Sequence, residues 1–163
     1  MKSPGEKRLV QQLPVEQTLG LIFTTGTVLI RKIFTFNHNL WEAMMKDKVL
    51  VICSCGTDNP NRATRALFFA MVAAKQGKQT VIFLLDEAVY LAKEGVMQNI
   101  KAATGDSADD HLTFLQEYGV PILVCTPCAV SRQITETDLI EGARMATGDK
   151  MIDLACESAV ISL

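Results

Sequence analysis

Apolar runs alternate with amphipathic and polar segments from about residue 46 to the end of the chain. Continuous apolar runs are typical of strands buried on both faces of a sheet, and they occupy residues 49–53, 80–85, 121–125 and 159–163. Helical patterns lie between these runs, at residues 60–76, 86–94, 107–119 and 151–157. This alternation predicts an α/β fold with a single, mostly parallel sheet of four to five strands joined by right-handed crossovers.

Local signals predict where some of these segments begin and end. Asn59 is a good N-cap, and Pro60 a good first residue, for a helix that ends at Gly77. The apolar positions of this helix predict an inward face made of Leu67, Phe68, Met71 and Val72. The residues from Thr135 to Asp138 resemble a capping box.

Residues 1–43 differ from the rest because they have no sustained helical or strand period. Gly26 lies between two short apolar runs, a pattern that favours a small hairpin. A docking arm is equally consistent with this segment, and so is a start codon assigned upstream of Met44. We therefore expect an N-terminal extension over 1–43 and an α/β domain over 44–163.

Composition and charge exclude several classes of function. A chain of 163 residues with 48% apolar residues fits one domain with its own core. The net charge of −2 does not favour nucleic acid or an anionic membrane as a partner. Arg31 and Lys32 interrupt the apolar stretch at 19–36, which falls short of a membrane-spanning helix. An odd number of cysteines, with no secretory pattern, predicts a soluble protein of the reducing cytoplasm.

The strongest chemical signal is the pair Cys125 and Cys128, which directly follows the third apolar run. The carboxyl ends of parallel strands form the edge at which ligands collect. Pro127 restricts the backbone between the two cysteines, so we expect both thiols in a defined loop. Such a pair can supply a thiolate, form a disulfide or bind a metal. Arg132 would favour the thiolate by its charge, or it is a solvated side chain on a turn.

A second pair, Cys53 and Cys55, closes the first strand on the same predicted edge. Four thiols could therefore converge there, to hold zinc or an iron–sulfur centre or to pass sulfur from one pair to the other. The alternative is that one residue of this pair simply belongs to the core. Cys156, in the last helix, is expected to be a core residue of that helix.

Acidic and histidine side chains are weaker signals. Asp86 and Glu87 end the second strand on this edge, where a carboxylate could move protons, orient a thiol or complement a helix dipole. His111 is expected to be a surface or hydrogen-bonded polar residue. The loop at 55–59 lacks the spacing of a dinucleotide or phosphate-binding motif, so we expect no nucleotide cofactor.

The chain resembles the DsrE/DsrF-like family, and within it the YchN-like branch, over about residues 48–163, and the segments that carry the resemblance are 83–89, 120–134 and 138–163. The segment 120–134 carries a strand, the C-x-x-C pair and Arg132. The segment 83–89 resembles the second strand of the branch, whose acidic residue falls at Glu87.

This resemblance carries expectations for fold, assembly and chemistry. It implies a three-layer α/β sandwich, assembly into trimers or hexamers, and a persulfide on the strand-end cysteine, which maps onto Cys125. Cys128 matches the second thiol of the branch. Gln133 stands where the family often has glycine, which predicts a different path for the loop after Arg132. Cys53 and Cys55 are not part of the family pattern, which leaves room for a metal site or a different partner.

We interpret the chain first as a sulfur carrier or sulfurtransferase-like protein that needs no cofactor. Cys125 would take a persulfide sulfur from a donor protein and offer it to an acceptor protein, with Cys128 assisting. Arg132 would favour the thiolate form of the cysteine, and Glu87 would orient the reacting groups. One alternative is thiol–disulfide redox work by the C-x-x-C pair. Another is a zinc or iron–sulfur protein whose ligands are Cys53, Cys55, Cys125 and Cys128.

The composition also bears on assembly. The mean hydropathy is positive. Phe68, Phe69, Val89 and Tyr90 are more apolar side chains than one helix face of a small domain can bury, so the chain has a surplus of apolar surface. Because large apolar patches are uncommon on monomers, we expect a closed homo-oligomer, a trimer or hexamer rather than a dimer. The cysteine pair should lie near a subunit boundary. The alternative is a monomer in which residues 19–36 cover the surplus.

Overall fold

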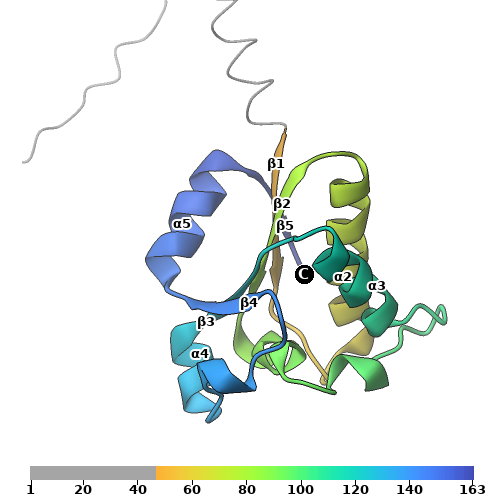
Figure 1. The fold of residues 1–163 in the computed structure, drawn as a ribbon, viewed down its shortest axis with the longest axis vertical. Helices are drawn as coiled ribbons and strands as arrows, with labels where there is room; N and C mark the ends of the chain where they lie inside the picture. The colour runs from red at the N-terminus through yellow and green to blue at the C-terminus, as the bar shows by residue number, and fades with distance from the viewer. Residues whose placement is uncertain (1–46) are drawn as a thin grey trace, which may run out of the picture. The chain divides into compact units, whose positions relative to one another are not determined.

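A five-stranded parallel sheet forms the centre of the domain, with helices on both faces (Figure 1). The computed structural model describes residues 47–163, so the predicted extension over 1–43 and its hairpin lie outside the described residues. The strands are β1 (Lys48–Cys53), β2 (Gln79–Leu84), β3 (Ile122–Cys125), β4 (Ala143–Ala146) and β5 (Ala159–Ser162). Across the sheet they run β4-β3-β2-β1-β5, and every neighbouring pair is parallel. The predicted three-layer α/β fold is confirmed, and β4 is the strand that the apolar pattern missed.

Four α-helices and three short 3-10 helices connect the strands of the described domain. They are α2 (Pro60–Lys75), α3 (Ala108–Glu117), α4 (Thr126–Ser131), α5 (Gly148–Glu157), η1 (Asp86–Ala92), η2 (Met97–Asn99) and η3 (Glu136–Asp138). The predicted capping box is confirmed, and it encloses the single turn of η3 between Thr135 and Asp138. Over residues 47–163, no helix combines the length and the apolar character that crossing a membrane requires.

The order of the strands explains why helices cover both faces of the sheet. The chain adds β2, β3 and β4 on one side of β1, and then returns to place β5 on the other side. Because parallel crossovers are right-handed, this reversal puts α5 on the face opposite α2 and α3 (Figure 1). The larger core lies between the sheet and α2, α3 and η1. The smaller core, made of Leu50, Phe83 and Leu123, lies under α5.

The predicted boundaries of α2 are confirmed, but its predicted inward face is partly wrong. The side-chain oxygen of Asn59 caps the helix by accepting a hydrogen bond from the backbone N–H of Arg62 (3.2 Å). The buried residues of α2 are Ala63, Thr64, Ala66, Leu67, Ala70 and Ala73. Phe68, Met71 and Val72 are only half-buried. Small side chains let the helix lie close to the sheet, so its bulkier apolar side chains sit at the sides of the contact.

A Schellman motif ends α4 and sets the path of the chain beyond it. The backbone N–H of Gln133 donates to the carbonyl oxygen of Val130 (3.0 Å), and that of Ile134 donates to the carbonyl of Ala129 (2.9 Å). Ile134 is buried, and a hydrophobic contact at this position frequently accompanies the motif. Gln133 has φ +58°, the left-handed region that favours glycine. Glutamine in place of the family's glycine therefore does not by itself force the different path that we expected.

We predict that Gln133→Gly raises the free energy of unfolding by about 1 kcal/mol, because glycine removes the steric cost of the left-handed conformation. The greater freedom of glycine in the unfolded chain offsets part of this gain. Urea denaturation measures the change. The matched control is Gln98→Gly in η2, where φ is not positive and a loss of about 0.5–1 kcal/mol is expected. Equal destabilisation by both substitutions would contradict the prediction.

Candidate functional site

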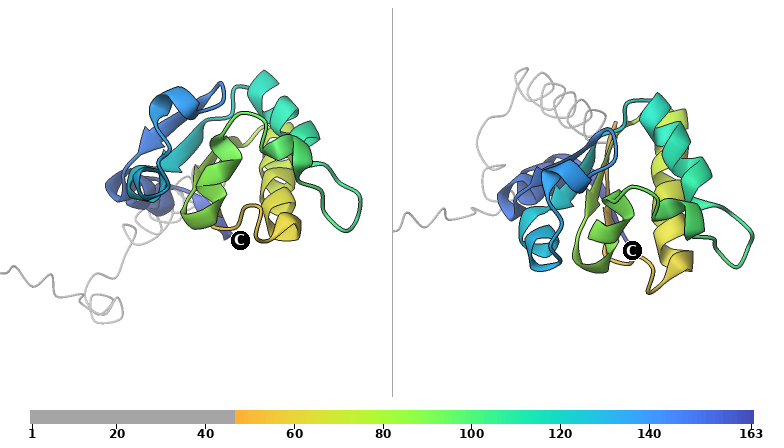
Figure 2. Two further views of the ribbon diagram at one scale, coloured as in Figure 1. Left: turned by 90° about the horizontal axis from the view of Figure 1, so that it is seen from below. Right: turned by 60° about the horizontal axis from the view of Figure 1, so that its bottom comes forward.

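The carboxyl ends of β1, β2 and β3 meet at one edge of the sheet, which faces the viewer in the left panel of Figure 2. The segments that leave these ends are the turn at 54–59, η1 and α4. α4 packs against η1 and lies beside it in both panels. This arrangement brings together the residues that the sequence placed at the edge of the sheet.

Cys125 and Cys128 lie next to one another, but not in a loop as predicted. Cys125 is the last residue of β3 and the N-cap of α4, and Cys128 lies in the first turn of that helix. The correction has a local cause, because Pro127 favours the first turn of a helix as well as a turn. The hydroxyl of Thr126 donates to the carbonyl oxygen of Ala146 (3.0 Å) and so fixes the turn to β4. Both thiols are half-buried.

The environment of Cys125 disfavours its thiolate. Burial raises the pKa of Cys125, and the side chain of Cys128 raises it further by hydrogen bonding. The backbone N–H of Cys128 acts in the opposite direction. The charge of Asp86 adds a smaller upward contribution to the pKa. These effects favour the thiol form of the strand-end cysteine over its thiolate.

Arg132 and Glu87, both predicted site residues, form an ion pair beside the thiols. The Nη2 and Nε atoms of Arg132 donate to Oε1 of Glu87 at 2.7 and 3.3 Å. Nη1 of Arg132 also donates to the carbonyl oxygen of Cys128 (3.1 Å). Arg132 therefore fixes η1 to α4. It does not lower the pKa of Cys125, but after Glu87 the charge of a Cys128 thiolate helps to raise the pKa of Arg132, so the guanidinium attracts a thiolate at Cys128. The thiolate-favouring role that we expected for Arg132 is not seen in the pKa of Cys125.

Asp86 is the residue whose importance the sequence did not single out. It begins η1 with φ +49°, an uncommon conformation for a residue other than glycine. Its Oδ1 atom lies 3.9 Å from the sulfur of Cys128. The sequence predicts Asp86 and Glu87 at the same edge of the sheet. The structure shows that Glu87 pairs with Arg132, whereas Asp86 faces the thiol of Cys128.

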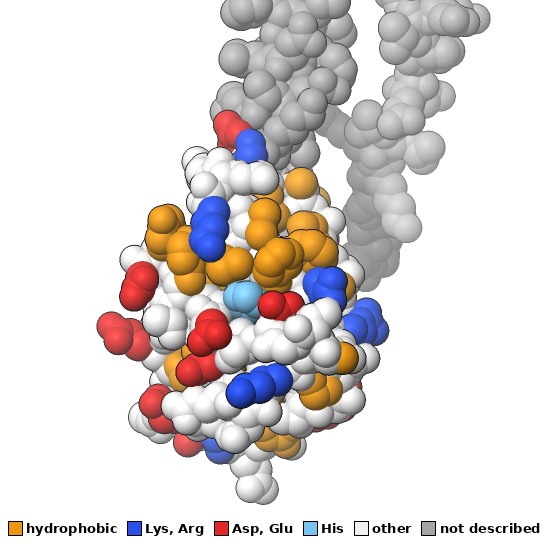
Figure 3. All heavy atoms as spheres, turned by 90° about the vertical axis from the view of Figure 1, so that its right-hand side faces the viewer, with side chains coloured by type: hydrophobic (Ala, Val, Ile, Leu, Met, Phe, Trp, Pro, Cys, Tyr) orange, Lys and Arg blue, Asp and Glu red, His pale blue; other side chains and the backbone are white. Residues whose placement is uncertain are grey.

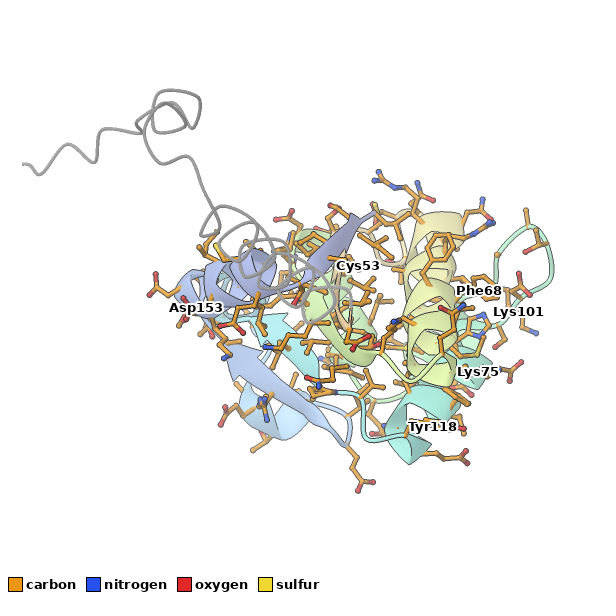
Figure 4. The ribbon with its side chains drawn as sticks, turned by 90° about the horizontal axis from the view of Figure 1, so that it is seen from above. Cys53, Phe68, Lys75, Lys101, Tyr118 and Asp153 are labelled. Carbon is orange, nitrogen blue, oxygen red and sulfur yellow. The ribbon has the colours of Figure 1, made fainter. Side chains whose placement is uncertain are left out.

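Cys53 is the last residue of β1 (labelled in Figure 4), and Cys55 follows two residues later; both thiols are buried. The sulfur of Cys53 donates to the carbonyl oxygen of Cys55 (3.2 Å), and burial raises the pKa of Cys53 to about 11. Within residues 47–163, no group of three or more His, Cys, Asp or Glu residues is arranged to hold a metal ion. The structure therefore does not bring the four thiols together as a metal site.

The predicted core position of Cys156 is wrong, because α5 leaves this thiol exposed.

His111 also differs from its prediction, because it is a buried side chain with an unpaired nitrogen. Only 8% of the residue is exposed, and Nε2 has no hydrogen-bond partner in the described part of the chain. Its ring contacts Phe68 edge-on, with 5.7 Å between the ring centres. Burial lowers the pKa of His111, so the neutral form is favoured.

Gly56 connects the turn after β1 to the site. A Cβ atom at this position would overlap the backbone carbonyl oxygen of Glu87. The backbone N–H of Gly56 donates to Oδ1 of Asp58 (2.6 Å), which holds the turn in this tight shape. Only glycine lets the turn lie against η1, and η1 in turn positions Asp86 beside Cys128 and Glu87 against Arg132.

We predict that Gly56→Ala destabilises the domain by about 1–3 kcal/mol and changes the alkylation rate of Cys125 and Cys128, because the new methyl group displaces η1. Gly148→Ala is the matched control, since a Cβ there meets no atom within 4 Å. Denaturation curves and iodoacetamide kinetics measure the two effects. Unchanged thiol kinetics in Gly56→Ala would disprove the connection between this turn and the site.

Comparisons with known proteins place this geometry in a family. The model of the DsrE/DsrF-like family matches residues 47–163. The uncharacterized protein MJ0989 of Methanocaldococcus jannaschii is 36% identical over 114 residues, which cover 68% of this chain and 94% of that protein. The uncharacterized protein MK0008 of Methanopyrus kandleri is 33% identical over 115 residues, covering 69% of this chain and 89% of that protein.

Two solved structures share the fold. The ychN protein from E. coli superposes with a TM-score of 0.60 at 21% identity, covering 73% of this chain and all of that one. The protein of unknown function MTH1491 from Methanobacterium thermoautotrophicum superposes with a TM-score of 0.52 at 14% identity, covering 72% of this chain and 99% of that one. Together with the family match over the whole described domain, these likenesses lead to one conclusion: the chain belongs to the DsrE/DsrF-like family.

Proposed function

We propose that this protein is a sulfur carrier that holds a persulfide on Cys125 and passes the outer sulfur to a partner protein. The observation that carries the proposal is the pair of half-buried thiols at the carboxyl end of β3, with Cys128 one helical turn beyond the strand. Membership of a DsrE-like family, which is associated with sulfur relay, supports it. No bound cofactor is needed for this chemistry.

The transfer step conserves atoms and electrons. The thiolate of Cys125 attacks the outer sulfur of a donor persulfide, and the donor's S–S bond breaks as the new S–S bond forms. The donor leaves as a thiolate, and Cys125 becomes the persulfide without net oxidation. An acceptor thiolate then repeats the same step on the outer sulfur and regenerates Cys125.

Cys128 gives the site a second possible outcome. Its thiol contacts Cys125, and it can attack the inner sulfur of the Cys125 persulfide. That step forms a Cys125–Cys128 disulfide and releases hydrosulfide, so the two cysteines are oxidised while the outer sulfur is reduced. The same contact favours thiol–disulfide redox work as the second candidate function.

We predict that anaerobic incubation with glutathione persulfide, followed by alkylation and tandem mass spectrometry, finds a one-sulfur adduct on Cys125. Cys125→Ser should lower the total adduct by about tenfold or more, because it removes the attacking sulfur. In Cys128→Ser the adduct should persist longer, because no neighbouring thiol displaces hydrosulfide.

Cys156 provides the internal control for this experiment. It is exposed, so non-specific sulfur transfer would label it at least as well as the half-buried pair. Absence of an adduct on both Cys125 and Cys128 would refute the sulfur-carrier function. A disulfide between them under mild oxidants, with no persulfide, would favour the redox function instead.

We also propose that the protein works as a closed homo-oligomer, a trimer or hexamer. Support comes from two large apolar side chains that remain exposed on α2 and at the end of α3, Phe69 and Tyr118. Apolar side chains gather on the face made by α2 and α3 (Figure 3). Aromatic rings from both helices are found there, with Phe68 against Phe69 and Phe114 against Tyr118. Val89 does not contribute to the apolar surplus, because it is fully buried within its own chain.

Light scattering on the full chain should give the mass of a trimer or hexamer. Phe69→Glu, on the α2–α3 face, should shift it towards the monomer by placing a charge in the contact. Ile152→Glu, on α5 in the opposite layer, is the matched control and should leave the mass unchanged. A monodisperse monomer for the unsubstituted chain would contradict this proposal.

A further inference from the structure

Asp86 is held in an unusual conformation that places its carboxylate beside the thiols. Its φ of +49° is left-handed, a region that costs about 1–2 kcal/mol for most residues and somewhat less for Asp and Asn. The turn begins η1 directly after β2 and brings Oδ1 of Asp86 to 3.9 Å from the sulfur of Cys128. Such strain at a site edge motivates a functional hypothesis.

The two carboxylates at the start of η1 differ in how their charge is balanced. Glu87 is paired with Arg132, whose guanidinium is further engaged by the carbonyl of Cys128. Within residues 47–163, no lysine or arginine forms an ion pair with Asp86, and its side chain is exposed. Arg132 is bound by Glu87 and by the carbonyl oxygen of Cys128, so within residues 47–163 the carboxylate of Asp86 faces Cys128 and the solvent without a cation of its own.

An uncompensated negative charge at this position acts on anything that approaches the sulfur atoms. An anionic reactant is repelled, and a cationic one is attracted, over the few ångströms that separate Asp86 from the reacting atoms. The same charge opposes ionisation of Cys125, and an arriving cation would relieve that opposition.

We propose that Asp86 is a specificity-determining residue that makes the site select sulfur donors and acceptors carrying an ammonium or guanidinium group next to their reactive sulfur. This inference rests on the proposed sulfur-carrier function for its biological meaning. The partner chemistry it specifies is a thiol or persulfide flanked by basic side chains. Anionic sulfur compounds such as thiosulfate or sulfonated persulfides are disfavoured.

The test compares thiosulfonate reagents of different charge on the full chain with Cys156 replaced by serine. Each reagent forms a mixed disulfide with a thiolate and releases methanesulfinate, so it reports reaction at the remaining accessible thiols. We would measure rates for the aminoethyl (cationic), sulfonatoethyl (anionic) and uncharged methyl reagents. Mass spectrometry assigns each adduct to Cys125 or Cys128.

Asp86→Asn is the informative variant, because asparagine tolerates the left-handed conformation and removes only the charge. The ratio of the labelling rate with the cationic reagent to that with the anionic reagent should be lower in Asp86→Asn than in the parent, by roughly fivefold or more at low ionic strength. The uncharged reagent should react faster, with the midpoint of its pH–rate profile at lower pH. Glu94→Gln removes an equal charge just beyond the end of η1 and should leave the ratio unchanged.

The outcomes separate this inference from the function on which it rests. A ratio that is the same in Asp86→Asn and the parent overturns the inference, as does an equal fall in Glu94→Gln. A second arm uses the persulfides of cysteamine (cationic) and mercaptoethanesulfonate (anionic). If neither loads Cys125 while the thiosulfonate ratio still depends on Asp86, the sulfur-carrier function fails and the charge selection stands. If both load equally well in the parent and in Asp86→Asn, the selection fails and the carrier function stands.

Discussion

The register of the three parallel strands β1, β2 and β3 is the constraint on which the site depends. Cys53 pairs with Leu84, and Leu84 pairs with Val124, so the three strands end at the same level. Cys125 then lies one residue beyond this level and Asp86 two residues beyond Leu84. A slip of one residue in either pairing would turn alternate side chains to the opposite face and separate the carboxylates from the thiols.

The positions of the chemistry-bearing residues were largely predictable from sequence. Buried parallel strands read as continuous apolar runs, and this signal located β1, β2, β3 and β5. The rule that strand ends share an edge then brought Cys125 and Glu87 to one place. β4 escaped prediction because Ala143–Ala146 is four residues long, contains an arginine and has no β-branched residue.

The details within the site depend on features that the residue pattern does not encode. Which of two adjacent carboxylates faces a thiol is decided by the left-handed turn at Asp86, and the chain has no glycine there to signal it. Burial of His111 and exposure of Cys156 follow from how α3 and α5 pack, and α5 has no fully buried residue at all. The alanine face of α2 has a similar origin, because the distance between helix and sheet decides which side chains fit.

The buried pair at the end of β1 has a practical consequence for following the motions of this domain. Cys53 is fully buried, with a pKa raised to about 11, so its sulfur reacts with electrophiles only when β1 opens. In the unfolded chain the same thiol would ionise near pH 8.5, like any free cysteine. The rate at which Cys53 is labelled in the native protein would therefore report local opening at the central strands. This rate, compared with that of the exposed Cys156 in the same molecule, would give the free energy of that opening without an engineered cysteine.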